Sequence, residues 1–382
     1  MKVFIAIDSF KGSLSSLRAG HAAAEGIRAV YPDAKIHVSP LADGGEGTVD
    51  AVITAASGIK KELRVTGPLG KPIIASYGIL PKTKTAVIEM AAASGITLVP
   101  TEKRDPLHTT TYGVGELIAD AVAEGCREFL IGIGGSATND GGAGMLQALG
   151  VKLLQNDGTP IEKGAIGLST LSRIDTSGIL PTLRECRIRV ACDVKNPLCG
   201  ENGCSAVFGP QKGATISSIK EMDAWLSRYA ALTQKYHNAN ADMNIPGCGA
   251  AGGLGFAFLS YLNAELASGI ELVLNATDAE SNIRDADIVI TGEGKLDAQS
   301  AMGKAPVGVA KLAKRHGKPV IALAGGVTEE AHITHAHGID SFFPIVRTPC
   351  SLADAMDEEN AYRNLKNTTE EIFRLLHTLR YQ

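Results

Sequence analysis

No run of about 18 consecutive apolar residues occurs in this sequence, so nothing in it predicts a membrane-spanning helix. The short apolar run at residues 3–7 ends at the carboxylate of Asp8 and is too brief for the core of a signal peptide. The seven cysteines are odd in number and scattered, and only Cys199 and Cys204 lie close together, so no disulfide framework is predicted. We therefore expect a reduced, cytoplasmic protein.

Neither sign of charge is in excess, because 37 Lys and Arg residues stand against 41 Asp and Glu residues, for a formal net charge of -4. A chain without a basic excess shows no electrostatic footprint for nucleic acid or for an anionic membrane. Aromatic residues are few, at 5%, but 45% of the 382 residues are hydrophobic, which is enough for more than one core. We expect two α/β domains and a small-molecule partner.

Short β-branched runs alternate with segments of helical periodicity, a rhythm typical of βαβ units and a mostly parallel sheet. The expected strands are residues 3–7, 36–40, 86–90, 129–133, 188–191, 287–290, 320–324 and 342–345. The expected helices are residues 17–30, 115–123, 219–235, 255–262, 306–316 and 358–379. The middle of the chain is less regular than its two ends. We therefore predict one domain from residues 1–66 and 285–382, with residues 67–284 inserted into it.

Acid-bearing turns follow the first two expected strands. Asp8, Ser9 and Lys11 bring a carboxylate, a hydroxyl and an ammonium group to the first strand end, and Asp43 and Glu46 lie among glycines after the second. Ligands of open α/β sheets bind at the carboxyl ends of parallel strands, and oxygen ligands suit magnesium. The alternative is that these residues only form turns and helix caps.

Residues 134–144 form the segment most suggestive of a ligand site, since glycines and polar residues follow an expected buried strand and precede a helix. Glycines there allow positive φ angles or a close approach to a phosphate. The segment lacks the Lys-Ser/Thr ending of a Walker A loop and the spacing of a dinucleotide fingerprint. A second glycine-rich loop at residues 247–253 has no side chain suited to chemistry, and the sequence leaves phosphate contact and close packing both open.

Two later turns also carry acids. Asp193 and Asn196 follow the expected strand at 188–191, and Glu293 and Asp297 follow the strand at 287–290. Perturbed carboxylates at such positions are candidates for acid–base chemistry or cation binding, whereas the alternative is that they are solvated loop charges.

Together these segments resemble the glycerate kinase family, whose members phosphorylate the 2-hydroxyl group of glycerate, as the bacterial glycerate 2-kinases do. The motifs that carry the resemblance are Asp8-Ser9-Phe10-Lys11, Asp43-Gly44-Gly45-Glu46-Gly47-Thr48, residues 134–144, Ala191-Cys192-Asp193, residues 208–214, residues 249–253 and Thr291-Gly292-Glu293-Gly294. The similarity spans essentially the whole chain. Ile7, Cys248 and Lys295 depart from the common pattern and affect only loop detail.

The resemblance implies two domains with the active site in the cleft between them. One domain would be flavodoxin-like with a parallel sheet, and the other a distinct mixed α/β domain inserted into it. It also implies an enzyme that uses ATP and Mg²⁺ to convert D-glycerate to 2-phosphoglycerate and ADP. The oligomeric state stays open between monomer and homodimer.

On this basis we assign roles to individual residues. The residues expected to contact ATP are Gly134, Gly135, Ser136, Thr138, Asn139, Asp140, Gly249, Gly252 and Gly253. Those expected to bind glycerate are Asp8, Ser9, Asp43, Asn196 and Glu293. The expected magnesium ligands are Asp43, Glu46, Asp193 and Glu293. Lys11 would neutralise phosphoryl or carboxylate charge, and either Asp193 or Asp297 would accept the proton of the attacking hydroxyl.

Two rival functions fit the same α/β scaffold. A nucleotide-cofactor oxidoreductase would need a Gly-x-Gly-x-x-Gly turn after the first strand, and residues 8–13 do not form one. A non-catalytic hinged ligand-binding protein would not need so many acid-bearing loops.

Overall fold

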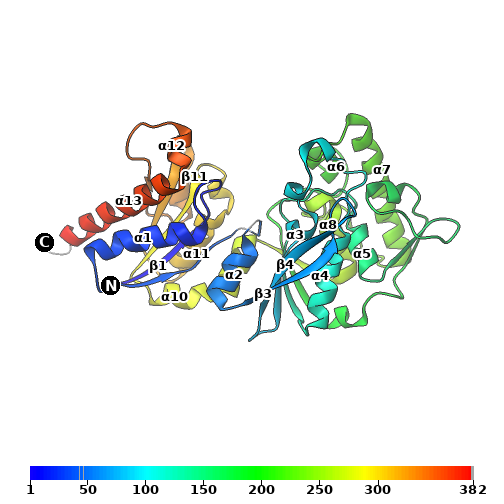
Figure 1. The fold of residues 1–382 in the computed structure, drawn as a ribbon, viewed down its shortest axis with the longest axis horizontal. Coiled ribbons are helices and arrows are strands. Elements are labelled where there is room, and N and C mark those ends of the chain that lie inside the picture. The colour runs from blue at the N-terminus through cyan, green and yellow to red at the C-terminus, as the bar shows by residue number, and fades with distance from the viewer. Residues whose placement is uncertain (43, 46, 380–382) are drawn as a thin grey trace. The chain divides into compact units, whose positions relative to one another are not determined.

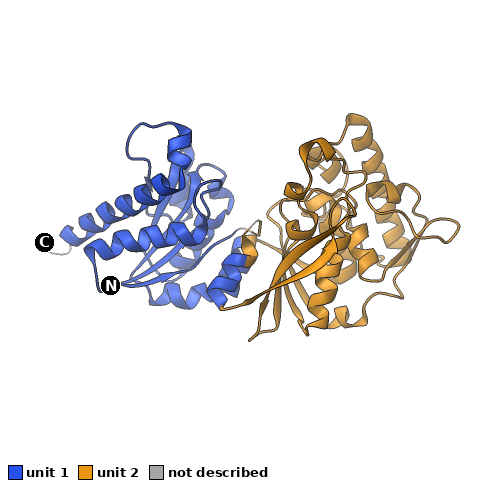
Figure 2. Cartoon of the chain, in the orientation of Figure 1, with its two compact units in different colours: residues 1–43, 50–56, 270–382 blue, residues 44–49, 57–269 orange. Residues whose placement is uncertain are grey.

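The computed structural model describes residues 1–42, 44–45 and 47–379 of the chain. The chain forms two compact units (Figure 2). The first unit comprises residues 1–43, 50–56 and 270–382, and the second comprises residues 44–49 and 57–269. The domain boundaries expected from the sequence, after residue 66 and before residue 285, stay a prediction.

Within the described residues, the first unit contains a five-stranded sheet in which every neighbouring pair is parallel. Its strands are β1 (Lys2–Ile7), β2 (Lys35–Val38), β11 (Ile288–Leu296), β12 (Val320–Val327) and β13 (Ser341–Pro344). The spatial order is β2-β1-β11-β12-β13, with Ile5 opposite both Val38 and Ile290. This is the flavodoxin-like strand order, so the expected fold of this unit is confirmed.

Helices cover both faces of this sheet because its central strands are apolar on both sides. The helical elements are α1 (Ser16–Val30), α2 (Thr48–Ala56), α9 (Gly269–Ala276), α10 (Ala279–Asp285), η6 (Ser300–Met302), α11 (Ala305–Arg315), η7 (Glu329–His337), α12 (Leu352–Met356) and α13 (Glu358–Leu379). Helices α1 and α13 lie side by side (Figure 1). A Cβ atom on Gly26 of α1 would lie 2.3 Å from the carbonyl oxygen of Lys366, so this close helix contact requires glycine.

The second unit contains a six-stranded mixed sheet in the order β10-β9-β6-β5-β4-β3, counted over the residues that the structure describes. Its strands are β3 (Ile59–Thr66), β4 (Pro72–Leu80), β5 (Thr85–Glu89), β6 (Glu128–Gly132), β9 (Arg187–Ala191) and β10 (Glu265–Ala267). The β10-β9-β6-β5 part is parallel, whereas β3 and β4 form an antiparallel hairpin. A small antiparallel pair is formed by β7 (Lys152–Leu154) and β8 (Arg173–Asp175). The second unit is thus the expected distinct, mixed α/β unit.

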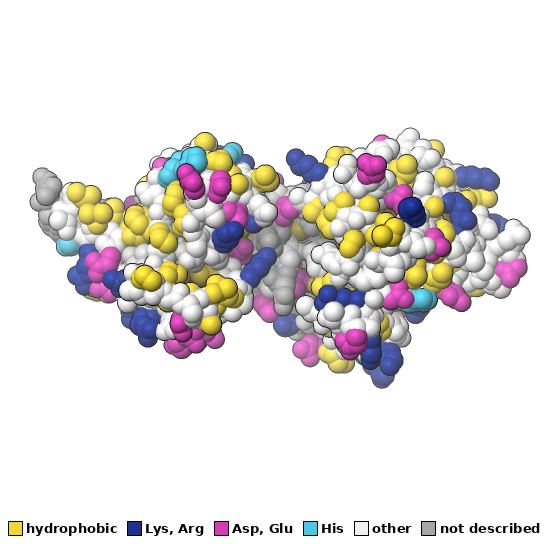
Figure 3. Space-filling view, turned by 90° about the horizontal axis from the view of Figure 1, so that it is seen from above, with side chains coloured by type: hydrophobic (Ala, Val, Ile, Leu, Met, Phe, Trp, Pro, Cys, Tyr) yellow, Lys and Arg dark blue, Asp and Glu magenta, His cyan; other side chains and the backbone are white. Residues whose placement is uncertain are grey.

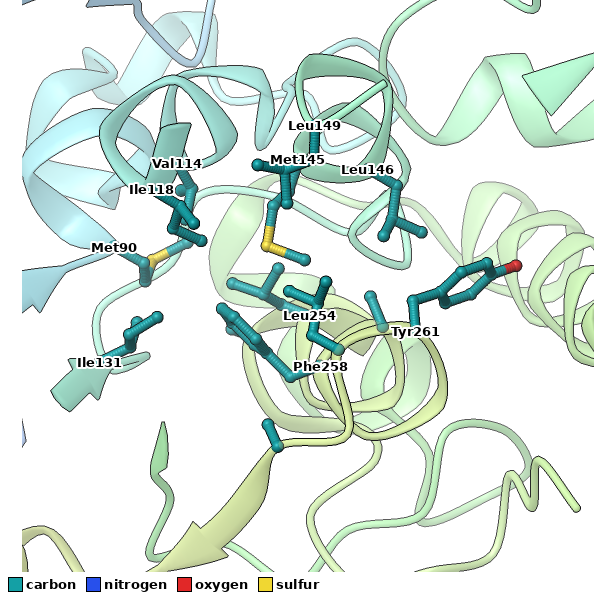
Figure 4. Packing of buried hydrophobic residues seen from close by; sticks show 14 of the residues in the cluster. Met90, Val114, Ile118, Ile131, Met145, Leu146, Leu149, Leu254, Phe258 and Tyr261 are labelled. Atoms are coloured by element: carbon teal, nitrogen blue, oxygen red, sulfur yellow. The ribbon is translucent and has the colours of Figure 1, made fainter. Parts of the chain in front are cut away.

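The core of the second unit is built around α8, which is buried along almost its whole length. The unit's helical elements are α3 (Ala91–Ser94), η1 (Ile96–Leu98), η2 (Thr101–Lys103), α4 (Tyr112–Ala123), α5 (Ala143–Ala148), η3 (Ala165–Ser169), η4 (Pro181–Glu185), α6 (Cys204–Phe208), η5 (Pro210–Lys212), α7 (Ile216–Tyr236) and α8 (Ala250–Leu262). Leu254 and Phe258 of α8 face Met145 of α5 and Ile118 of α4 (Figure 4). A helix that is apolar on all sides is stable only when it is surrounded in this way.

On the face shown in Figure 3, basic and acidic side chains are mixed rather than gathered into one field. Among the described residues, no helix combines the length and the apolar character that crossing a bilayer requires.

Candidate active site

The first unit holds a pocket of about 780 Å³ at the carboxyl ends of β1, β11, β12 and β13. Its volume falls in the range of small-molecule sites, roughly 300–1,000 Å³. The residues that line it are Asp8, Ser9, Phe10, Lys11, Ser13, Glu293, Gly294, Lys295, Asp297, Lys304, Gly325, Gly326, Val327, Thr328, Ile345, Val346, Cys350, Ser351, Leu352, Ala355 and Met356. Five residues assigned from the sequence, namely Asp8, Ser9, Lys11, Glu293 and Asp297, therefore lie around one pocket.

The topology of the sheet explains why a pocket forms there. Helix α1 follows β1 and shares a core cluster with Val3, Ile5 and Ile7 on one face of the sheet. Helix α11 follows β11, packs against β11, β1 and β12, and contributes no residue to that cluster. The two connections thus leave the sheet toward opposite faces between adjacent strands, and a crevice opens at such a switch point.

Glu293 is a buried carboxyl group of this pocket with a raised pKa. It is 7% exposed, and burial raises its pKa to about 7, with the nearby Asp8 and Asp297 charges adding to the increase. A hydrogen bond from the Ser300 hydroxyl and the charge of Lys304 oppose this increase. Three acids and three lysines around one pocket form a polar wall that suits an anionic substrate together with a cation.

The turn after β11 holds Asp297 in place. Its Oδ1 accepts a hydrogen bond of 2.9 Å from the backbone N–H of Gln299, and its own N–H donates to Ser300 Oγ at 3.1 Å. Lys295 Nζ lies 3.6 Å from Asp297 Oδ2. Ser300 therefore links the Asp297 turn to Glu293.

Asp193 and Asn196 lie in the second unit, after the carboxyl end of β9. Asp193 Oδ1 accepts a 3.2 Å hydrogen bond from the N–H of Gly269, and the Asp193 side chain is exposed. Asn196 Nδ2 donates to the Asn202 carbonyl at 2.8 Å, and the Asn196 carbonyl accepts from Gly249 N–H at 3.0 Å. Asn196 thus holds its own loop and the start of the 249–253 loop.

The two glycine-rich loops of the second unit pack directly against each other. Gly141 N–H donates to the Gly252 carbonyl at 2.9 Å. Gly252 has a φ of 68°, and a Cβ atom there would lie 2.1 Å from the Thr138 carbonyl oxygen. Of the nine residues expected to contact ATP, only Gly134 and Gly135 are exposed. Close packing therefore explains the glycine at 252 without a ligand.

Asp140 is fully buried at the centre of the 134–144 loop. Its carboxylate accepts hydrogen bonds from Thr111 N–H and Thr111 Oγ1, each at 2.9 Å, and from Gly142 N–H at 3.1 Å and Gly144 N–H at 3.2 Å. Burial raises the pKa of this carboxyl group, while the four donors act in the opposite direction. These contacts make Asp140 a structural anchor of the loop.

The sequence does not single out Lys212, although this lysine lies in the 208–214 motif. Its side chain is 2% exposed, and its ammonium group donates to Ser136 Oγ at 2.8 Å and to the Thr138 carbonyl at 2.6 Å. Burial lowers the pKa of Lys212 to about 8, although the nearby Cys204 and Asp140 favour the charged form. The 208–214 motif was the only sequence feature that pointed to Lys212, because the sequence around one lysine does not reveal whether its side chain is buried.

In the Lys212→Met variant, the free energy of unfolding is expected to depend less on pH than it does in the wild type. Unfolded Lys212 keeps its proton up to its ordinary pKa of 10.5, whereas the folded state releases it near 8. Between these values the unfolded state binds more protons, so the free energy of unfolding of the wild type rises with pH, by up to about 3 kcal/mol. Urea unfolding at pH 7.5 and pH 10 measures this rise.

The control for that experiment is Lys220→Met, because Lys220 is exposed on α7 of the same unit. Lys220→Met should keep the wild-type slope. Equal slopes for the Lys212→Met variant and the wild type would show that Lys212 titrates as an exposed lysine.

Magnesium binding was expected at Asp43, Glu46, Asp193 and Glu293. Asp43 and Glu46 lie outside the described residues, and Asp193 and Glu293 belong to different units. The described part of the chain contains no group of three or more His, Cys, Asp or Glu residues arranged to hold a metal ion. Magnesium in kinases is typically held by one or two carboxylates plus substrate phosphates, so a preformed cage is not required.

Comparison with known proteins identifies the family. The profile of the glycerate kinase family matches residues 3–377. The chain belongs to the glycerate kinase family. It is therefore an enzyme of the kinase class, and the resemblance drawn from the motifs is confirmed.

Several known proteins are similar to this kinase over nearly their full length. The chain is 51% identical to the glycerate 2-kinase of Escherichia coli over 372 residues, or 97% of each chain. It is 50% identical to the glycerate kinase of Bacillus subtilis, again over 97% of each chain. A crystal structure from Salmonella typhimurium LT2 superposes with a TM-score of 0.91 at 48% identity and covers all of both chains. The fold of this kinase thus agrees with that of a crystallised protein.

Proposed function

We propose that this kinase transfers the γ-phosphoryl group of ATP to the 2-hydroxyl group of D-glycerate in the cytoplasm, giving 2-phosphoglycerate and ADP. The names of its relatives support this reaction. The observation that carries it is the pocket of the first unit, where buried Glu293 lies with Asp8 and Lys11 at the ends of parallel strands.

Phosphoryl transfer requires the protein to position the reactants and to neutralise charge, rather than to form covalent bonds with them. The 2-oxygen of glycerate attacks the γ-phosphorus, the bond to the β–γ bridging oxygen breaks, and ADP leaves with that oxygen. The hydroxyl proton passes to a carboxylate, for which Asp193 and Asp297 are the proposed acceptors. Lys11 is proposed to neutralise the charge of the phosphoryl group or the glycerate carboxylate.

Asp8, Ser9, Asn196 and Glu293 are the described residues that we propose for glycerate binding; Asp43, also proposed, lies outside them. The ATP contacts proposed for residues 134–144 and 249–253 have Gly134 and Gly135 as their exposed members.

The negative charge of the acids that line the pocket of the first unit favours a bound cation. Asp8 and Asp297 raise the pKa of Glu293 by their negative charge, and a bound cation would relieve that repulsion. We propose Glu293 and Asp193 as magnesium ligands, together with Asp43 and Glu46. Magnesium, when bound, neutralises charge on the β- and γ-phosphate oxygens.

An assay of the purified chain with ATP, magnesium and D-glycerate tests the proposal. We expect ADP and 2-phosphoglycerate to form in equal amounts, and chelation with EDTA to lower the rate about 100-fold or more, because phosphate charge is then left unneutralised. Phosphorus NMR distinguishes 2-phosphoglycerate from 3-phosphoglycerate.

The same preparation tests the rival functions. Reduction of NAD or NADP by glycerate would identify an oxidoreductase. Glycerate binding without ATP consumption, in a chain that unfolds cooperatively, would identify a binding protein and overturn the kinase proposal.

A further inference from the structure

The pocket of the first unit is larger and less polar than glycerate requires. Its volume of about 780 Å³ suits a drug-sized ligand rather than a three-carbon acid. One wall carries the acids and lysines described above. Other lining residues are apolar; we call them the apolar wall, and they include Phe10, Val346, Leu352 and Met356.

Helix α12 supplies much of the apolar wall. Leu352, Ala355 and Met356 line the pocket, whereas Ala353 and Asp354 do not. This i, i+3, i+4 spacing places the three lining residues on one face of the helix. Leu352 is 75% exposed, so its side chain has little protein to pack against. Binding of an apolar ligand group against Leu352 would remove this exposed apolar surface from water, which is favourable.

Met356 links this wall to the loop after β1. A Cβ atom on Gly12 would lie 3.0 Å from Met356 Cε, so the end of α12 lies against the loop that carries Lys11. The apolar wall and the first of the lysines are therefore neighbours within one pocket.

We propose that the pocket of the first unit binds the nucleoside of ATP, with the purine base against the α12 face formed by Leu352, Ala355 and Met356. The inference rests on the proposed function. A flat, largely apolar ring attached to a polyanion matches a pocket lined both by the apolar face of α12 and by Lys11, Lys295 and Lys304.

The part of the pocket proposed to hold the phosphates has room for them to approach the backbone closely. A Cβ atom on Gly326 would meet no atom within 4 Å, so the chain is open there. Lys304 immediately precedes the first turn of α11, whose N–H groups favour anions. The proposal competes with the assignment of ATP to residues 134–144 and 249–253, and the same experiment decides between them.

Cys350 provides a direct probe. It lines the pocket and is the one exposed cysteine among the seven, all of which fall within the described residues. Alkylation with iodoacetamide, followed by mass spectrometry, measures its accessibility. ADP with magnesium is expected to slow alkylation of Cys350 about tenfold or more. D-glycerate should slow it less, because it has no base to cover the α12 face.

A charge placed on the α12 face tests the contact itself. Leu352→Asp should raise the KM for ATP about 10- to 100-fold, because the proposed apolar contact between Leu352 and the base is replaced by a carboxylate, while the KM for glycerate changes little. Leu375→Asp is the matched control, since Leu375 is 58% exposed on α13 and does not line the pocket. The control should behave as the wild type.

The outcomes separate this inference from the proposed function. Glycerate phosphorylation with no protection of Cys350 by ADP and an unchanged KM for ATP in Leu352→Asp would overturn the inference and leave the function standing. Protection of Cys350 without any phosphorylation of glycerate would leave the nucleotide site standing and overturn the function.

Discussion

Replacing Asp193 by Asn is expected to lower kcat about 10²- to 10⁴-fold, the usual contribution of a general base. An amide cannot accept the proton of the glycerate hydroxyl group. It can, however, keep the 3.2 Å hydrogen bond that Asp193 Oδ1 accepts from Gly269 N–H, so the loop after β9 should be preserved. Steady-state kinetics measures the effect on kcat, and thermal unfolding checks that the variant is folded.

The companion variant is Asp297→Asn, because the two acids are alternative proton acceptors. Only one of the two variants should show the full loss of kcat. Asp242→Asn is the control, since Asp242 is exposed and its Oδ1 holds a local turn by accepting from the backbone N–H and the side-chain Nδ2 of Asn244. Wild-type turnover in the Asp193→Asn variant would remove Asp193 from the mechanism.

Replacing Asp140 by Ala is expected to lower the free energy of unfolding by about 3–5 kcal/mol. Asp140 is fully buried, and its carboxylate accepts four hydrogen bonds from Thr111, Gly142 and Gly144. Alanine would leave these donors buried without a partner and would open a small cavity. Urea or thermal unfolding of the purified variant measures the loss.

Asp157→Ala is a closely matched control. Asp157 also accepts from the N–H and the hydroxyl group of one threonine, Thr159, but in an exposed loop. Its replacement should cost less than about 1 kcal/mol, because water can satisfy the freed donors. Asp140→Asn should fall between the two. If the Asp140→Ala and Asp157→Ala variants were equally stable, Asp140 would not anchor its loop.

The parallel sheet of the first unit could be predicted because β1, β11 and β12 are largely buried on both faces and therefore appear in the sequence as apolar runs. Ile288, Val289 and Ile290 are such a run, and they form the start of β11. The long amphipathic helices were predictable for a similar reason, since α13 shows one apolar face over 22 residues.

No strand is predicted from the sequence at β3 or β4, because the alternation of apolar and polar residues there is weak. Residues of β3 are mostly exposed or half-buried, and charged residues interrupt the strand. Residues 67–70, directly after the predicted domain boundary, form the tight turn of this hairpin, in which the Gly67 N–H donates to the Lys71 carbonyl. Strands of three residues, such as β7 and β8, are too short to show any period.

The candidate site was predictable where side chains with evident chemistry lie near strand ends: Asp8 directly follows β1, and Glu293 lies in the last half of β11. The burial of Ser136, Thr138 and Asn139 was not predictable, because glycine-rich loops that bind phosphate and those that pack on one another have the same composition. Only tertiary contacts, such as that between Gly141 and Gly252, distinguish the two.

Strand β1 lies between β2 and β11 and pairs along its second edge with residues 288–292. During synthesis on the ribosome, nearly 300 residues must emerge before that edge finds its native neighbour, whereas residues 57–269 of the second unit are complete earlier. The nascent amino-terminal segment thus carries an apolar strand with one open edge through most of translation, the stage at which such strands are most prone to aggregate.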